Sequence, residues 1–152
     1  MSQQTVDHIV ARFNALGIRA KLTTHQAVRT SEEAAAVRGV PLGTGVKALV
    51  CKRKDGGFVL VLAKGDERAD LKKVALLEGS RLSMASAEEV EQLTDCVPGA
   101  VPPFGFEPAL KTYFDTRIRT QGIVTFNIGL QTHSAEIAEA DLEKALGDVV
   151  EY

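Results

Sequence analysis

A chain of 152 residues can bury a core of its own, so we expect one domain over residues 1–152. Its formal net charge of −2 argues against a protein that holds nucleic acid by broad electrostatic attraction, so any contact with RNA must be local, weak or assisted by a partner. The chain has neither an apolar run near the roughly 18 residues of a membrane span nor an N-terminal signal pattern, which predicts a cytoplasmic protein without a membrane segment.

The N-terminal part of the chain predicts two helices with a short strand between them. Apolar residues recur at helical spacing at Val6, Ile9, Val10, Phe13 and Leu16. Gly17 is placed to end that helix, and residues 18–24 follow as a strand. Thr30-Ser31-Glu32-Glu33 has the pattern of a capping box, so a second helix should run from there to about Gly39.

The middle of the chain predicts a hairpin and a third helix. Two β-rich runs, at 46–52 and 58–63, flank Lys54-Asp55-Gly56-Gly57, which is a hairpin signal. Asp70 is placed to begin a helix that Gly79 ends. The hairpin must be antiparallel, which excludes a purely parallel sheet.

A strand over 81–85 and a helix that begins at the capping box Ser86–Glu89 precede an unusual loop, Val97–Gly105. The loop holds three of the five prolines and two glycines, so it can be neither helix nor inner strand. Its apolar side chains predict that it packs against the protein, and a rigid loop of this kind suits the wall of a small-molecule pocket. A purely structural connection between a helix and a strand is the alternative.

The C-terminal part predicts strands at 111–115, 123–128 and 135–137, and a closing helix at 141–146 that starts as early as Glu139. Strands and helices are interspersed without regular β-α-β alternation, which indicates an α+β fold with a mixed, strongly curved sheet and helices packed around it. The nearly continuous apolar runs 48–51 and 123–126 are typical of central strands that are buried on both faces.

Lys47 is the most unusual polar residue, because it lies within the apolar run 45–51. A lysine in an inner strand is costly unless its ammonium reaches water, a pocket or an anion. A lysine that snorkels out from the start of the strand is the structural alternative, and both interpretations stay open at this point.

The histidines and cysteines suggest no metal site and no cofactor. His8, His25 and His133 lack metal-ligand spacing, and neither Cys51 nor Cys96 is near one of them in sequence. We expect reduced, mostly buried thiols, although a Cys–His nucleophilic pair formed in the fold stays open. The sequence contains no phosphate-binding loop, dinucleotide fingerprint or nucleophile elbow.

The order of these signals resembles the YbaK family, also called the prolyl-tRNA-synthetase-associated or INS-like editing domains. The resemblance runs from about His25 to Leu146. It rests on motifs in a fixed order: His25, Thr30-Ser31-Glu32-Glu33-Ala34, Val46-Lys47-Ala48-Leu49, Asp70-Leu71-Lys72-Lys73-Val74, Arg81-Leu82-Ser83-Met84-Ala85, the Gly99–Pro103 loop and Ala138-Glu139-Ala140-Asp141-Leu142. The family fold implies a curved, partly barrel-like mixed sheet.

The resemblance implies a hydrolase that cuts the ester between a wrong small amino acid, such as Ala, Cys or Ser, and the terminal adenosine of tRNA. Lys47 would fix a phosphate or the carbonyl oxygen, and the backbone N–H groups of Gly99 and Ala100 would bind the oxyanion. The substrate-binding residues would be Thr23, His25, Thr30, Val101, Pro102, Pro103, Phe104, Asn127, Gly129 and Ser134. No protein base is evident, and a ribose hydroxyl of the substrate can help to activate water in the resembling enzymes.

The sequence departs from the family pattern at positions that line the amino-acid pocket. Asn127-Ile128 stands where members often carry Ser-Gly or His-Pro, Ser134 where some have aspartate, and Thr23 where some have tyrosine. These departures bear on the identity of the amino acid more than on the reaction. A second group of residues is predicted as a basic rim for tRNA, or else as solvated or paired charges: Lys52, Arg53, Lys54, Lys72, Lys73, Arg117 and Arg119.

The expected partner is the 3′ acceptor end of aminoacyl-tRNA, with or without an aminoacyl-tRNA synthetase beside it, and we expect a monomer. Two alternatives stay open. One is a non-catalytic tRNA- or synthetase-binding module with the same fold. The other is a hydrolase or binder of a small aminoacyl or nucleotide-like ligand.

Overall fold

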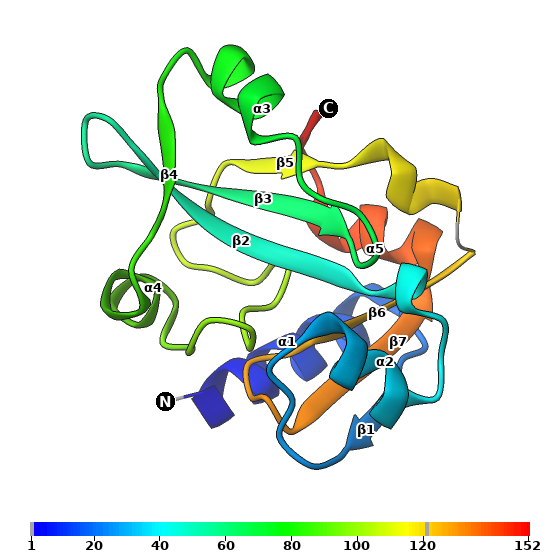
Figure 1. The fold of residues 1–152 in the computed structure, drawn as a ribbon. Helices are drawn as coiled ribbons and strands as arrows, with labels where there is room; N and C mark the ends of the chain where they lie inside the picture. Colours follow the sequence, from blue (N-terminus) through cyan, green and yellow to red (C-terminus); the bar gives the residue numbers. More distant parts are fainter. Residues whose placement is uncertain (1, 121) are drawn as a thin grey trace.

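In the computed structural model, which describes residues 2–120 and 122–152, the chain forms two sheets with five α-helices around them (Figure 1). The larger sheet has the order β4-β2-β3-β5-β8. The hairpin strands β2 (Val46–Arg53) and β3 (Phe58–Lys64) are antiparallel, as is β4 (Leu82–Met84) beside β2. The strands β5 (Thr112–Phe114) and β8 (Val150–Glu151) add in parallel, which makes the sheet mixed as expected.

The smaller sheet is antiparallel, with the order β1 (Lys21–Thr24), β7 (His133–Ala138), β6 (Ile123–Asn127). A single parallel bridge between Gly45 and Thr125 joins the two sheets. The sheets do not close into a full barrel, which agrees with the partly barrel-like sheet that the family fold implies.

The capping signals of the sequence are confirmed in the helices. The Thr30 hydroxyl accepts the Glu33 N–H at the start of α2 (Ser31–Arg38), and Ser86 forms a full capping box at the start of α4 (Ala87–Thr94). Asp70 caps α3 (Leu71–Glu78). The remaining helices are α1 (Ser2–Leu16), α5 (Glu139–Leu146) and the 3-10 turns η1 (Leu42–Thr44) and η2 (Thr116–Thr120).

Three strand predictions need correction. The strand expected over 18–24 begins only at Lys21, because the Ile18 N–H still donates to Phe13 O at the end of α1. The apolar run 123–126 forms an edge strand and not a central one, and Val124 and Phe126 are buried because they pack into the main core. Strand β8 was not predicted, since two residues carry no periodicity.

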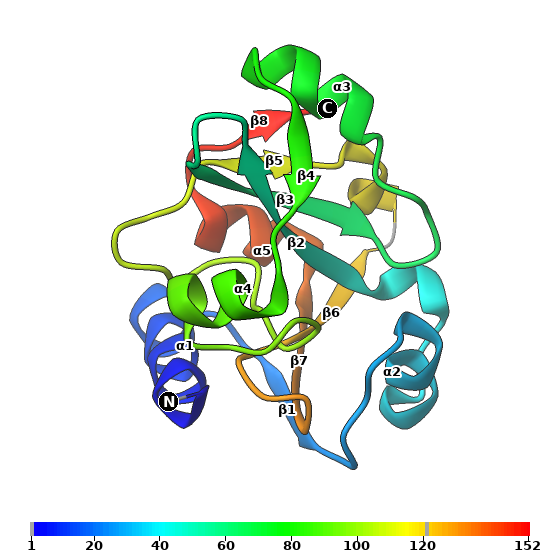
Figure 2. The ribbon, with the colours of Figure 1, turned by 60° about the vertical axis from the view of Figure 1, so that its left-hand side comes forward.

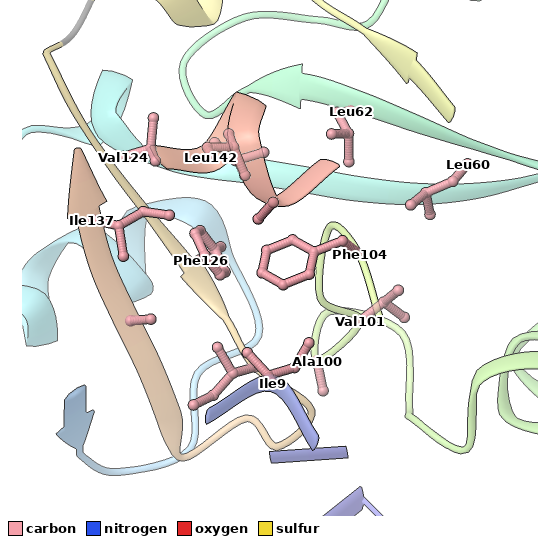
Figure 3. Packing of buried hydrophobic residues seen from close by; sticks show 14 of the residues in the cluster. Ile9, Leu60, Leu62, Ala100, Val101, Phe104, Val124, Phe126, Ile137 and Leu142 are labelled. Carbon is pink, nitrogen blue, oxygen red and sulfur yellow. The ribbon is translucent and has the colours of Figure 1, made fainter. Parts of the chain in front are cut away.

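Strand β3 is the buried centre of the molecule. Leu60 and Leu62 point into the main core, and Val59 and Val61 point into a second cluster beneath α3. Figure 3 shows Phe104 and Phe126 in the main core, where their ring centroids lie 6.0 Å apart in an edge-to-face pair. The proline-rich loop is thus part of the core and not a free connection.

Helix α3 lies on one side of the larger sheet, and the smaller sheet with α1 and α2 lies on the other (Figures 1 and 2). Helix α2 stands beside the first residues of β2, whereas α3 packs near the hairpin end of that strand. Within the described residues no helix is long and apolar enough to span a membrane.

Candidate functional site

A cavity of about 220 Å³ lies where α2, the start of β2, the proline-rich loop and β6 meet. Residues from distant parts of the chain line it, including Thr30, Arg38, Lys47, Gly99, Val101 and Asn127. The strand lysine and the Gly99 turn, which the sequence singled out separately, therefore share one cavity. Apolar residues such as Val28, Ala34 and Leu42 share its wall with polar ones, a mixture that fits a small organic ligand.

Lys47 lines this cavity, which lies against the edge of β2 between the Gly45–Thr125 bridge and the residues that pair with β4. Strand β4 pairs with β2 only at residues 51–53, so the edge near Lys47 is open. The Lys47 ammonium donates to the Glu67 carbonyl oxygen over 2.6 Å, in the loop that follows β3. An ammonium has three donors, so this bond fixes the side chain and leaves capacity for an oxygen of a ligand.

The proline-rich loop presents Gly99 to the cavity and buries most of its later residues. Gly99 is exposed and has a φ of +87°, a conformation that glycine adopts without strain. Four further residues that were predicted at the site pack into the protein instead of lining the cavity: Ala100, Pro102, Pro103 and Phe104. The apolar side chains anchor the loop, because their burial lowers the free energy of the folded chain.

The role expected for the Ala100 N–H needs correction. This N–H donates to the Val97 carbonyl oxygen over 3.0 Å, which closes the turn from within. A donor that is already used by the turn is not available to a substrate. Of the two N–H groups predicted to bind the oxyanion, that of Ala100 is therefore used within the turn.

Arg38 is a residue of the site that sequence reasoning missed. Its guanidinium donates to Ser134 Oγ (2.9 Å), Thr125 Oγ1 (3.2 Å) and Asn127 Oδ1 (2.9 Å). Burial lowers the pKa of Arg38 to about 10, and in the described part of the chain no carboxylate forms an ion pair with it. A largely buried cation that meets only neutral oxygens is costly for stability, and it lines the cavity.

Asn127 connects Arg38 to the loop. Its Oδ1 accepts from Arg38 and from Ser134, so its Nδ2 is turned toward the loop, where it donates to the Gly99 carbonyl oxygen. The last residue of α2 therefore holds the cavity-facing glycine through one amide. This connection spans three segments that are remote in the sequence.

Three further predicted residues lie together, but behind the cavity wall. Thr23 pairs with Ser134 in the register of β1 and β7, and His25 Nε2 lies 2.7 Å from Ser134 Oγ. None of the three lines the cavity, and Ser134 connects them to it through its contacts with Arg38 and Asn127. The remaining predicted residue, Gly129, is buried after β6 and also does not line the cavity.

The thiols and the proposed basic rim do not contribute to this cavity. Cys51 and Cys96 are buried, and burial raises the pKa of Cys51 to about 11. Arg117 is paired with Asp115 and Glu67, and Arg119 with Glu143 and Glu151. The basic rim is therefore wrong for these two arginines, whose charges are neutralised locally. Four other residues of the predicted basic rim line a separate depression: Lys52, Arg53, Lys54 and Lys72.

The residues that the structure describes contain no cluster of three or more His, Cys, Asp or Glu side chains able to hold a metal ion.

Residues 25–145 match the family model of the aminoacyl-tRNA editing domain. The chain belongs to this family. The match includes every residue of the cavity named above, and the resemblance drawn from the motifs is confirmed.

Individual relatives of this editing domain agree with the family assignment. The multifunctional Ser/Thr-tRNA deacylase ProXp-y of Escherichia coli K12 is 38% identical over 148 residues, which covers 93% of this chain and 89% of the relative. A proline–tRNA ligase of Bacillus licheniformis is 38% identical over 93 residues, 60% of this chain but 16% of the ligase. A crystal structure of a protein provisionally described as a trans-editing enzyme for prolyl tRNA synthetase superposes with a TM-score of 0.85 at 29% identity, covering 97% and 94% of the two chains.

Proposed function

We propose that this editing domain is a free-standing hydrolase that removes a wrongly attached small amino acid from tRNA. Water attacks the carbonyl carbon of the aminoacyl ester, the bond to the ribose oxygen breaks, and that oxygen leaves with a proton. The observation that carries the proposal is that Lys47 and Gly99 face the same cavity, in a chain of the editing family. We propose that the protein is a monomer in the cytoplasm. Its substrate would be aminoacyl-tRNA that a synthetase has released.

The roles follow from the donors that the cavity offers. Lys47 supplies a positive charge on a fixed stem, which can hold a phosphate or the carbonyl oxygen of the terminal aminoacyl adenosine. The Gly99 N–H is the candidate donor to the oxyanion of the tetrahedral intermediate. The cavity has no carboxylate or histidine as a base among the side chains that line it, so we assign activation of water to a ribose hydroxyl of the substrate.

The cavity also bears on which amino acid is removed. Thr30, Arg38 and Asn127 add polar groups to its wall, which suit a hydroxyl group more than a methyl group. Together with the relative named for Ser/Thr-tRNA deacylation, this makes serine our first candidate.

The test is a deacylation assay with tRNAs that carry Ser, Thr, Ala or Cys, comparing the wild type with Lys47→Ala. We expect cleavage of at least one substrate by the wild type and a loss on the order of 10²–10³ in rate for the variant. Lys21→Ala, an exposed strand lysine of β1, is the matched control and should keep the rate.

Two results would contradict the proposal. Binding of tRNA without cleavage of any substrate would indicate a binding module. Equal cleavage of free aminoacyl esters and of aminoacyl-tRNA would indicate an enzyme for small ligands.

A further inference from the structure

A second depression of the surface lies at the other end of β2, between the β2–β3 hairpin tip, α3 and β4. Its volume is about 540 Å³. We call it the basic groove, because its lining includes five cationic side chains: Lys52, Arg53, Lys54, Lys72 and Arg81. It shares no lining residue with the candidate active cavity.

Among the residues that the structure describes, three of the five cations have no carboxylate partner. Lys52 pairs with Glu89 over 2.6 Å, and Arg53 pairs with Glu78 over 2.5 Å. For the other three, no ion pair occurs within residues 2–120 and 122–152: Lys54, Lys72 and Arg81. In a chain with a net charge of −2, this is a local concentration of uncompensated positive charge.

The walls of the groove are held in place by hydrogen bonds between its elements. The Lys54 N–H donates to Ser80 Oγ over 3.1 Å, and the Ser80 hydroxyl donates to the Arg81 carbonyl oxygen over 3.0 Å. Glu78, whose side chain is 1% exposed, joins α3 to the sheet through Arg53 and through the Tyr113 hydroxyl at 2.6 Å. The groove is therefore preformed, and a ligand would not have to order it.

The groove and the candidate active cavity lie along the same strand. Lys47 lines the cavity at the start of β2, and Arg53 lines the groove at its end. The two residues are six positions apart along the strand, which corresponds to roughly 20 Å. An elongated ligand that contacts both must be at least this long.

We propose that the basic groove binds phosphates of the tRNA acceptor stem while the cavity holds the aminoacylated 3′ end. The inference rests on the proposed function, which fixes one end of the RNA in the cavity. The adjoining stem must then lie on the neighbouring surface, and the groove supplies its positive charge there. Lys54, Lys72 and Arg81 contact phosphate oxygens, so they add affinity without reading the base sequence.

The test uses the full chain and the triple variant Lys54→Ala/Lys72→Ala/Arg81→Ala. The probe is a fluorescently labelled unacylated tRNA transcript, with binding measured by anisotropy from about 50 to 200 mM salt. We expect the affinity to fall about tenfold or more, and the slope of log K against log salt to decrease by about one for each cation removed. Arg19→Ala, which removes an exposed cation after α1, is the matched control and should leave both quantities unchanged.

A second measurement separates the groove from the active cavity. Hydrolysis of seryl-adenosine, which has no stem, should proceed at the wild-type rate in the triple variant, while KM for seryl-tRNA rises. Equal losses on both substrates would overturn the proposal, since the effect would then be structural. Unchanged affinity of the triple variant for tRNA would also overturn the proposal. The groove would then be a candidate site for an acidic protein partner. If the wild type cleaves no aminoacyl-tRNA but the triple variant still loses tRNA binding, the proposed function fails and the groove assignment stands.

Discussion

Arg38 Nη2 donates to Asn127 Oδ1 over 2.9 Å, although the two residues are 89 positions apart in the sequence. Asn127 in turn donates to the Gly99 carbonyl oxygen. The end of α2 therefore holds the cavity-facing turn of the proline-rich loop through one side-chain amide. Three of our predictions test this arrangement, and a fourth tests a buried carboxyl at the start of α5.

Replacing Asn127 by alanine should impair catalysis more than stability. The Gly99 turn would lose the donor that orients its carbonyl group, and small misplacements of a catalytic group cost up to about 10²-fold in rate. We expect kcat to fall by about 10- to 10²-fold, with a thermal midpoint within a few degrees of the wild type. Asn14→Ala, at an exposed position of α1, is the control and should change neither. An unchanged kcat in the Asn127 variant would show that the amide does not position the loop.

Replacing Arg38 by methionine should change selectivity. The cavity would lose a polar wall that suits a hydroxyl group, whereas a substrate with a methyl side chain loses nothing comparable. We expect the ratio of kcat/KM for seryl-tRNA over alanyl-tRNA to fall about tenfold. Parallel kinetics on the two substrates measure this ratio. A proportional loss on both would mean that Arg38 acts only through the loop.

Replacing Gly99 by alanine tests the backbone of the turn. The Gln131 side chain lies 4.0 Å from a Cβ built there, which is ordinary van der Waals contact, so the variant is not excluded by this neighbour. Its φ of +87° should cost about 1–2 kcal/mol of unfolding free energy. Gly56→Ala at the hairpin tip, with a φ of +95° and open space, is a matched control for that cost.

Both glycine variants should therefore lose similar stability in chemical denaturation, while only Gly99→Ala loses deacylation. If Gly99→Ala kept the same deacylation activity as Gly56→Ala, the Gly99 turn would not be part of the active site.

The carboxyl of Glu139, at the start of α5, predicts a pH dependence of stability. Burial, followed by the neighbouring Glu143 carboxyl, raises the pKa of Glu139 to about 7, and its Oε1 is buried without a hydrogen-bond partner. A group with a raised pKa in the folded state contributes its full stability below the unfolded pKa, near 4.5, and loses it as the pH rises through about 7.

Glu139→Gln should accordingly be more stable than the wild type at pH 8, by at least about 1 kcal/mol, and similar to it near pH 4.5. Urea unfolding at the two pH values measures the difference. A constant difference between the proteins at both values would contradict the raised pKa.

The local elements of this protein follow from its sequence, because their causes are local. Thr30, Ser86 and Asp70 cap helices at the expected positions, since a cap requires only a side-chain oxygen and the amides within the next turn. The proline-rich loop was recognisable for the same reason, because proline and glycine restrict or free the backbone at their own positions. Lys47 stood out since a charge within an apolar run is costly wherever the strand lies.

Tertiary structure alone decided which of these features form one site. Arg38 is an ordinary last residue of a helix in the sequence, and only the packing of α2 against β6 and β7 surrounds it with three neutral oxygens. Ala100 and Phe104 belong to the core because of contacts with other segments, which no pattern within the loop reveals. Burial and long-range hydrogen bonds depend on neighbours that are dozens of residues away, so the sequence determined the elements and the fold determined the geometry of the cavity.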